Sequence, residues 1–355
     1  MILEVNLQYA PGASFDTIVN DILGRGWGLV LGISVGFLLY ILLYAYCSAM
    51  GSIVVHMSGL EAETLGSGMQ GSLGFILAML LSIAVWISTK FVGRLTSILV
   101  IGMAISFLIV TSNALPSISL DSLIRPTNLD NQYAYLWAAL PYLITSFGFS
   151  SVVPSLYKYY GSKPNTIRKS LLIGSLIALA TYIIWLSIAF GILSRPEFLP
   201  INSAGGNVGD LVNALEQKIG NHTLQNALNF FTNFAIISSF LGVGLSLFDY
   251  LADRFNLDSS KKNRFITSCL TFLPPAVASF FFPHGFIKAI GFAGLVLYVA
   301  FFLIPIIMLL KSRATHKELA YKFWGGQTTI YLTLALSSII AVCHILSMMD
   351  FLPKY

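Results

Sequence analysis

Apolar residues along this chain gather in nine long runs separated by shorter polar segments. The runs are about 20 residues or more, which is long enough for a helix to cross a lipid bilayer. This pattern predicts an all-α polytopic membrane protein. The runs cover residues 27–57, 71–88, 92–112, 134–159, 171–193, 224–252, 265–282, 286–310 and 326–348. We expect them to form a single transmembrane domain over residues 1–355.

The polar segments carry a few local signals. Residues 1–26 lack a long apolar run, and Ser14 or Asp16 is placed to cap a short helix through Ile22 that ends at Gly24. Polar Glu61 and Glu63 predict a loop before the second span. The longer polar segment 194–221 predicts an amphipathic helix after Asp210, with an apolar side made of Leu211, Val212, Leu215 and Ile219.

Charge sets the orientation. If the runs alternate across the membrane, 15 of the 20 Lys and Arg residues fall on the side of the N-terminus. Short loops rich in Lys and Arg are cytoplasmic, so this side is predicted to be the cytoplasm. The net charge of +5 does not indicate nucleic-acid binding, because these residues lie in loops between spans. The cysteines Cys47, Cys269 and Cys343 lie inside apolar runs and are interpreted as small packed residues.

The fourth run contains features that oppose a continuous helix. Four hydroxyls and Gly148 lie near its middle, and Pro154 follows. Proline removes a helical N–H and crowds the preceding turn, and glycine lowers the cost of unwinding. An interrupted helix at membrane depth is tolerated where its backbone lines a cavity or binds something. The alternative is a kinked packing helix with small residues at an interface.

The two halves of the chain repeat. The long run at 27 pairs with that at 224, and the runs at 71 and 92 pair with those at 265 and 286, at offsets of about 194–197 residues. An odd offset in spans reverses topology, which predicts an inverted repeat of the kind that secondary transporters use. If the same offset is subtracted from the runs at 134 and 171, their partners fall before Met1. The repeat therefore predicts two further helices, about 60 residues, ahead of this sequence. The alternative is a coincidence of helix spacing.

Four segments carry a resemblance to a known family. They are Ser146–Tyr159, Ile167–Ser175, Ser238–Asp253 and Phe282–Phe286. They resemble the bacterial tryptophan/tyrosine permeases of the amino acid/polyamine/organocation superfamily, and the likeness covers essentially the whole chain. The resemblance implies a five-plus-five inverted-repeat fold within eleven spans, of which this chain has the third to the eleventh. Residues 3–7 resemble the cytoplasmic end of the second.

The family resemblance also implies a function. It implies a secondary transporter in the bacterial inner membrane that imports aromatic amino acids, tryptophan or tyrosine, with protons. The glycine-rich first helix of the family, which would supply half of the substrate site, is not in this sequence. A truncated, non-transporting remnant or partner of a transporter therefore stays open as an alternative. The resemblance implies no cofactor besides the coupling proton, and lipid and a small-molecule substrate as the partners.

The substrate site follows from the resemblance. A zwitterion binds where half-helix ends offer N–H groups to its carboxylate and carbonyls to its ammonium. Residues 146–151 are expected to supply one such break, and Phe147 and Phe149 are placed to stack on an aromatic ring. The candidate residues are Ser146, Phe147, Gly148, Phe149, Ser150 and Ser151, with Ser238, Ser239 and Tyr44 as further walls. For these last three, ordinary helix packing is the alternative.

Other chemistry finds little support in the sequence. An intramembrane enzyme is disfavoured, because there is no His-Glu-x-x-His pattern and no pair of carboxylates in a span. His344 lies toward the outer end of the last run, where a lone histidine is more often a packed residue than a proton carrier. No proton relay is identified, so proton coupling depends on the resemblance alone.

Overall fold

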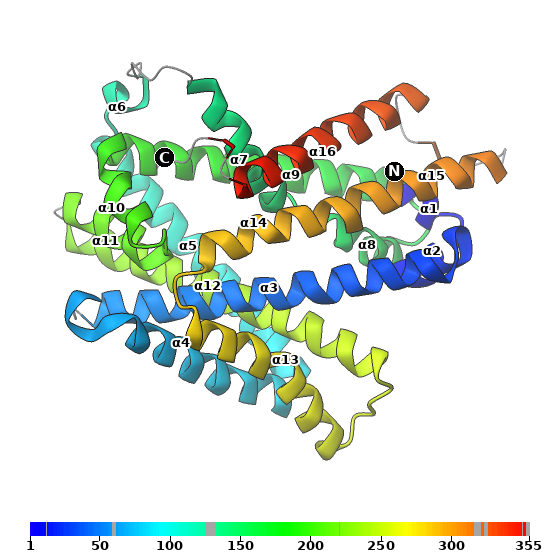
Figure 1. Cartoon of the computed structure of the whole chain (residues 1–355), viewed down its shortest axis with the longest axis horizontal. Coiled ribbons are helices and arrows are strands. Elements are labelled where there is room, and N and C mark those ends of the chain that lie inside the picture. Colours follow the sequence, from blue (N-terminus) through cyan, green and yellow to red (C-terminus); the bar gives the residue numbers. More distant parts are fainter. Residues whose placement is uncertain are drawn as a thin grey trace. The chain divides into compact units, whose positions relative to one another are not determined.

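The computed structural model describes residues 1–11, 13–58, 62–124, 132–219, 221–315, 321–322, 326–349 and 351–352. Within these residues the chain is helical and has no strand (Figure 1). Nine spans in the described residues are long and apolar enough to cross a membrane. The predicted all-α polytopic fold is therefore confirmed.

The helices agree closely with the apolar runs. The last helix covers the predicted residues 326–348, and the first long helix begins two residues before the predicted 27. The helices of the first half are α1 (Ile2–Asn6), α2 (Phe15–Leu23), α3 (Arg25–Met57), α4 (Ala62–Ile87), α5 (Thr89–Ala114), η1 (Leu115–Ser117), α6 (Leu120–Ile124), α7 (Gln132–Ser146), η2 (Phe149–Val152) and α8 (Val153–Tyr160). Those of the second half are α9 (Pro164–Ile192), η3 (Arg195–Glu197), α10 (Phe198–Ser203), α11 (Val208–Lys218), α12 (His222–Arg254), α13 (Lys261–Phe281), α14 (Phe286–Leu297), the π-helical η4 (Tyr298–Leu303), α15 (Ile304–Thr315) and α16 (Gly326–Met348).

The predictions for the polar segments are confirmed in part. Ser14 caps α2, its hydroxyl accepting the Thr17 N–H at 3.1 Å, and Gly24 ends the helix with φ +94°. The predicted loop around Glu63 is wrong, because α4 is already helical from Ala62; polar residues extend a helix freely once it leaves the lipid. The prediction at Glu61 lies outside the described residues. Segment 194–221 carries η3 and α10 as well as the predicted amphipathic helix, α11. α11 begins at Val208, before the predicted start after Asp210, and ends at Lys218, so Ile219 follows the helix instead of lying on its apolar side.

The repeat offset holds in the helix bounds. α3 and α12 are both 33 residues long and begin 197 residues apart, α4 and α13 begin 199 residues apart, and α5 and α14 begin 197 residues apart. The agreement supports the repeat in sequence. The inverted five-plus-five arrangement in space stays a prediction.

Contacts divide the chain into two compact units. The first comprises residues 1–38, 129–181 and 291–355, and the second comprises 39–128 and 182–290. In the first unit α15 packs against α1 and α2, and α16 packs against α7 and η4. A bidentate ion pair joins α1 to α15: Arg313 Nε and Nη2 each donate to a Glu4 oxygen at 2.7 Å.

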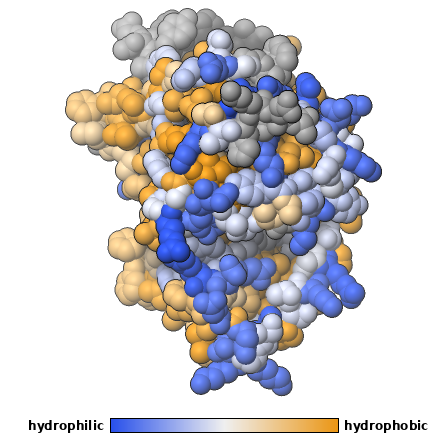
Figure 2. Space-filling view, turned by 90° about the vertical axis from the view of Figure 1, so that its right-hand side faces the viewer, coloured by the Kyte–Doolittle hydropathy of each residue, from blue (hydrophilic) through white to orange (hydrophobic). Residues whose placement is uncertain are grey.

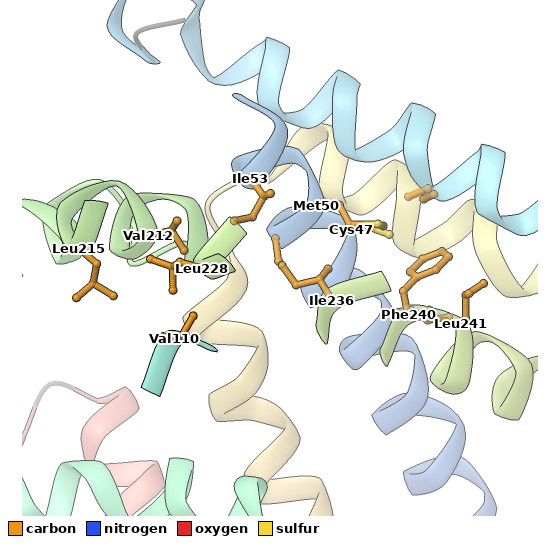
Figure 3. Close-up of a cluster of buried hydrophobic side chains, with 14 of the residues drawn as sticks. Cys47, Met50, Ile53, Val110, Val212, Leu215, Leu228, Ile236, Phe240 and Leu241 are labelled. Carbon is orange, nitrogen blue, oxygen red and sulfur yellow. The ribbon is translucent and has the colours of Figure 1, made fainter. Parts of the chain in front are cut away.

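The second unit has the larger apolar core. α12 packs along α5 and α13 packs along α4. Figure 3 shows buried side chains of α3, α11 and α12 gathered around Ile53, Leu228 and Phe240. Phe240 and Phe272 are nearly inaccessible, with ring centroids 5.4 Å apart. A Cβ on Gly244 would lie 2.6 Å from the Phe272 ring, so the close approach of α12 and α13 depends on a glycine there.

Large apolar side chains are also abundant on the surface. Ile87, Leu108 and Ile98 are each about two-thirds exposed, on α4 and α5. Exposed apolar residues on such a scale mark a surface that faces something other than water. Figure 2 shows hydrophobic residues mainly along the left side of one face, with hydrophilic residues over its middle and right. This distribution agrees with spans that face lipid.

Glu197 joins the two ends of the polar segment before α12. Glu197 forms an ion pair with Lys218 at 2.6 Å and accepts hydrogen bonds from the N–H and hydroxyl of Ser194. The Lys218 contact, followed by the two Ser194 hydrogen bonds, lowers the pKa of Glu197 to about 2 from 4.5. Because the folded-state pKa is the lower one, this stabilisation is complete above pH 4.5 and is lost as the pH falls toward 2.

We expect this loss to appear in thermal unfolding. Between neutral pH and the acid range below 4.5, the wild-type melting temperature should fall more than that of Glu197→Gln, since glutamine has no charge to lose. The difference is small, because the pair is largely exposed and screened by solvent. Identical pH profiles for the two proteins would contradict the assignment.

Candidate functional site

The predicted interruption of the fourth span is present. α7 ends at Ser146, residues 147–148 are non-helical, η2 covers 149–152 and α8 begins at Val153. The end of α7 is tightened by short-range bonds: the N–H of Phe147 donates to the Ile144 carbonyl and that of Gly148 to the Thr145 carbonyl, both at 3.1 Å. Pro154 lies in the first turn of α8, where a missing N–H costs nothing.

Hydroxyls satisfy carbonyls in the last turn of α7. Thr145 Oγ1 donates to the Pro141 carbonyl and Ser146 Oγ to the Tyr142 carbonyl, both at 3.1 Å. Each bond runs to the carbonyl four residues earlier in the same helix, which is the usual partner of a Ser or Thr hydroxyl inside a helix. These two hydroxyls therefore have partners within α7 and need none from outside the span.

Glycines bring α14 close to this half-helix. A Cβ on Gly294 would lie 2.9 Å from both the Pro141 carbonyl oxygen and Thr145 Oγ1. A Cβ on Gly148 would lie 3.0 Å from Leu297 Cδ1. The break is therefore packed against the end of α14 rather than left loose.

A cavity of about 410 Å³ adjoins the break. Phe149 and Ser150 of η2 form part of its wall, opposite aromatic residues of the π-helical η4. Sites for drug-sized ligands are of this volume and are mostly apolar with a few polar groups. The lining residues are Met1, Ile2, Leu3, Phe149, Ser150, Val153, Arg168, Leu171, Phe301, Phe302, Pro305, Ile306, Tyr321 and Thr333, all of the first unit.

The chemistry of the wall suits a small aromatic zwitterion. Phe149, Phe302 and Tyr321 offer ring faces and edges. Arg168 supplies a cation, and Ser150 and Thr333 supply hydroxyls. A guanidinium is well matched to a carboxylate, and the hydroxyls can accept from an ammonium.

The predicted site residues divide between the two units. In the first unit, Phe149 and Ser150 line the cavity, whereas Ser146, Phe147, Gly148 and Ser151 flank it in sequence and are not among its described lining residues. Tyr44, Ser238 and Ser239 belong to the second unit and are described there by themselves.

The second-unit residues have local partners. The Tyr44 hydroxyl donates to the Phe282 carbonyl at 2.7 Å, and a Cβ on Gly285 would collide with it. Ser238 is buried and donates to the Ala235 carbonyl of its own helix at 3.2 Å. Ser239 is half-buried and interacts with the Tyr46 hydroxyl. These contacts fit the packing alternative for Tyr44 and Ser238.

Sequence reasoning missed part of the cavity wall. Arg168 counted only as a basic loop residue, and Phe301 and Phe302 only as members of an apolar run. The available signal was the sequence Phe301-Phe302 upstream of Pro305, because proline favours an irregular turn before it. π-helical turns are rare and often lie at functional sites.

Residues 32–36 have the spacing Gly-x-Ser-x-Gly, which in some hydrolases surrounds the nucleophilic serine. That motif requires a sharp strand-to-helix turn to expose the serine. α3 is helical throughout Arg25–Met57, so Ser34 has no such turn. The motif therefore gives no support to an enzymatic function.

Comparison with known proteins identifies the family of this chain. The sequence profile of the tryptophan/tyrosine permease family matches residues 1–344. The chain is 44% identical to the tryptophan-specific transport protein of Shigella flexneri, over 100% of this chain and 85% of that protein. It is 36% identical to the low affinity tryptophan permease of Escherichia coli strain K12 and 35% identical to the tyrosine permease of Enterobacter agglomerans, each over 100% of this chain and 86% of the relative.

The match covers nearly the whole chain and includes the break and the cavity wall. With nine candidate spans in its described residues, the protein is a multi-pass membrane protein. It belongs to the tryptophan/tyrosine permease family.

Proposed function

We propose that this protein is a secondary transporter that imports tryptophan or tyrosine across the bacterial inner membrane by proton symport. The observation that carries the proposal is the interrupted span α7–η2–α8 beside a cavity walled by aromatic rings. The names of the relatives, tryptophan-specific transport protein and tyrosine permease, support the class of substrate.

The cavity wall offers binding partners for the aromatic ring and for the carboxylate of the substrate. The aromatic ring would lie against Phe149 and Phe302, and the carboxylate would face Arg168. The other predicted residues, Ser146, Phe147, Gly148 and Ser151, would shape the break itself. Tyr44, Ser238 and Ser239 lie in the second unit and stay proposals from the sequence, with helix packing as their alternative.

Orientation is part of the proposal. With alternating spans, 15 of the 20 Lys and Arg residues fall on the N-terminal side, which places that side in the cytoplasm. Basic loops on the far side would be costly to translocate. The proton gradient across the inner membrane would then drive accumulation inside.

Uptake of labelled tryptophan into a strain lacking its own aromatic permeases tests the proposal. We expect saturable uptake when the full chain is expressed, competed by excess tryptophan or tyrosine and unaffected by excess leucine, since leucine lacks the ring that the cavity wall would bind. An uncoupler should abolish accumulation. Inserted protein without uptake, or equal competition by leucine, would overturn the assignment.

A further inference from the structure

His344 is a buried histidine to which the site described above assigns no role. It lies in α16, is 4% exposed, and neither ring nitrogen has a hydrogen-bond partner among the residues that the structure describes. Leaving a buried donor or acceptor unpaired is destabilising, because its lost contact with water is not replaced. Ionisable residues within membrane spans are rare and usually functional. Packing alone would be served better by an apolar residue of similar size.

The ring lies against α14 and near α7. A Cβ on Gly291 would lie 3.0 Å from His344 Cε1 and 3.4 Å from the Tyr142 hydroxyl, so both side chains occupy the space left by a glycine. The Phe292 ring meets the imidazole edge-on at 6.5 Å. Gly291 therefore lets the imidazole approach the broken span.

A small cavity of about 10 Å³ lies beside the imidazole. Such a volume is near the lower limit, roughly 10–15 Å³, for one water molecule. Its walls come from three segments of the first unit: Pro141 and Ile144 of α7, Gly294, Leu295 and Tyr298 of the α14–η4 segment, and Ile340, Ala341 and His344 of α16.

The titratable groups around the ring are phenols. Tyr142 faces it from α7, and Tyr298, whose hydroxyl is 2.8 Å from Ser338 Oγ, faces the cavity from η4. The described residues that line the cavity or pack on the ring include no carboxylate and no cation. A proton on His344 would therefore be a buried charge without a counter-ion, which is strongly unfavourable unless water reaches it.

The wall at Pro141 links this cavity to the break. Pro141 accepts the Thr145 hydroxyl in the last turn of α7, and its carbonyl lies against Gly294. A shift of the half-helix away from α14 would enlarge the cavity and let water solvate an imidazolium. Its return would expel that water and the proton. The space beside the ring thus couples proton binding to the position of α7.

We propose that His344 is the proton-binding residue of the transport cycle, an inference that rests on the proposed function. A ring nitrogen of His344 accepts a proton from hydronium on the outer side, which leaves water and an imidazolium. When α7 repacks against α14, the imidazolium returns the proton to water on the cytoplasmic side and regains its lone pair. The proton gradient supplies the driving force, and no covalent bond to the substrate forms.

The test separates coupling from transport. The purified full chain in proteoliposomes is assayed for tryptophan accumulation driven by an imposed pH gradient, and for counterflow exchange of labelled against unlabelled tryptophan without a gradient. For one proton per substrate, each pH unit allows about tenfold accumulation, since it corresponds to 1.36 kcal/mol. We expect His344→Gln and His344→Phe to lower this accumulation ratio to about one while exchange stays within about twofold of wild type. His222→Gln, at the exposed start of α12, should accumulate as wild type does.

The outcomes are distinct. Accumulation by His344→Gln equal to wild type overturns the inference, as does restoration by phenylalanine, which would show a packing role. Loss of exchange in a folded variant also overturns it, because the residue would then be needed for transport itself. If the wild type exchanges tryptophan but a pH gradient drives no accumulation, the proton-binding role of His344 is refuted and the proposed transport of tryptophan is not. Absence of tryptophan exchange in the wild type would instead refute the proposed function.

Discussion

Leucine at Gly148 is expected to lower the initial rate of tryptophan uptake at least about tenfold, which requires only 1.4 kcal/mol of strain in the working state. A Cβ there already lies 3.0 Å from Leu297 Cδ1 and 3.1 Å from the Thr145 carbonyl oxygen. The remaining atoms of leucine have no room unless the end of α7 moves away from α14. Overpacking of this kind typically costs 1–3 kcal/mol.

The matched control is Gly174→Leu. Gly174 lies within α9, and a Cβ there meets nothing within 4 Å, so the same substitution adds apolar surface without a clash. Both variants should insert at wild-type levels, measured by immunoblot of membranes. Wild-type uptake by Gly148→Leu would remove the break from the mechanism, whereas equal loss in Gly174→Leu would mean that leucine harms the protein generally.

A second pair separates the break from the cavity. Ser150→Leu fills the cavity wall, and Ser155→Leu makes the same change on an exposed face of α8. The first should lose uptake and the second should keep it. Retention of uptake by Ser150→Leu would place the substrate elsewhere.

The fold was largely predictable because lipid imposes a simple rule. Runs of apolar residues long enough to cross the bilayer become helices, and the last run, 326–348, matches α16 to the residue. The error at Glu63 arose outside the apolar run, where hydrophobicity does not decide whether a helix continues. α4 extends over these polar residues and begins at Ala62. Bounds outside the membrane depend on caps and contacts that the hydrophobic pattern does not contain.

The candidate site was predictable only where local chemistry decides it. Gly148 and Pro154 oppose a continuous helix whatever surrounds them, so the break could be inferred from sequence. The π-helical turn that places Phe301 and Phe302 on the cavity depends on how η4 packs, and its sequence resembles any apolar span. The isolation of His344 likewise depends on the glycine it faces, Gly291, 53 residues earlier in the chain.

Among the ion pairs of the described residues, removing Arg313 is the substitution expected to destabilise the protein most. Its guanidinium makes two bonds of 2.7 Å to Glu4, whose side chain is completely buried. Breaking one side of a buried pair typically costs about 3–5 kcal/mol, because the other charge stays buried. Arg313→Ala should therefore lower the melting temperature in detergent by several degrees, measured by a thermal-shift assay.

Because Arg313 and Glu4 differ in burial, the two single variants should differ in stability. Arg313 retains 18% exposure and can reach solvent when unpaired, but Glu4 has none, so Arg313→Ala should be worse than Glu4→Ala. The double variant should cost less than the sum of the two single variants, because neither charge is then left alone. Lys218→Ala is the control: it breaks a pair of 2.6 Å whose side chains are 49% and 32% exposed, and should cost at most about 1 kcal/mol. Equal, small effects for Arg313→Ala and Lys218→Ala would show that the α1–α15 contact does not depend on this pair.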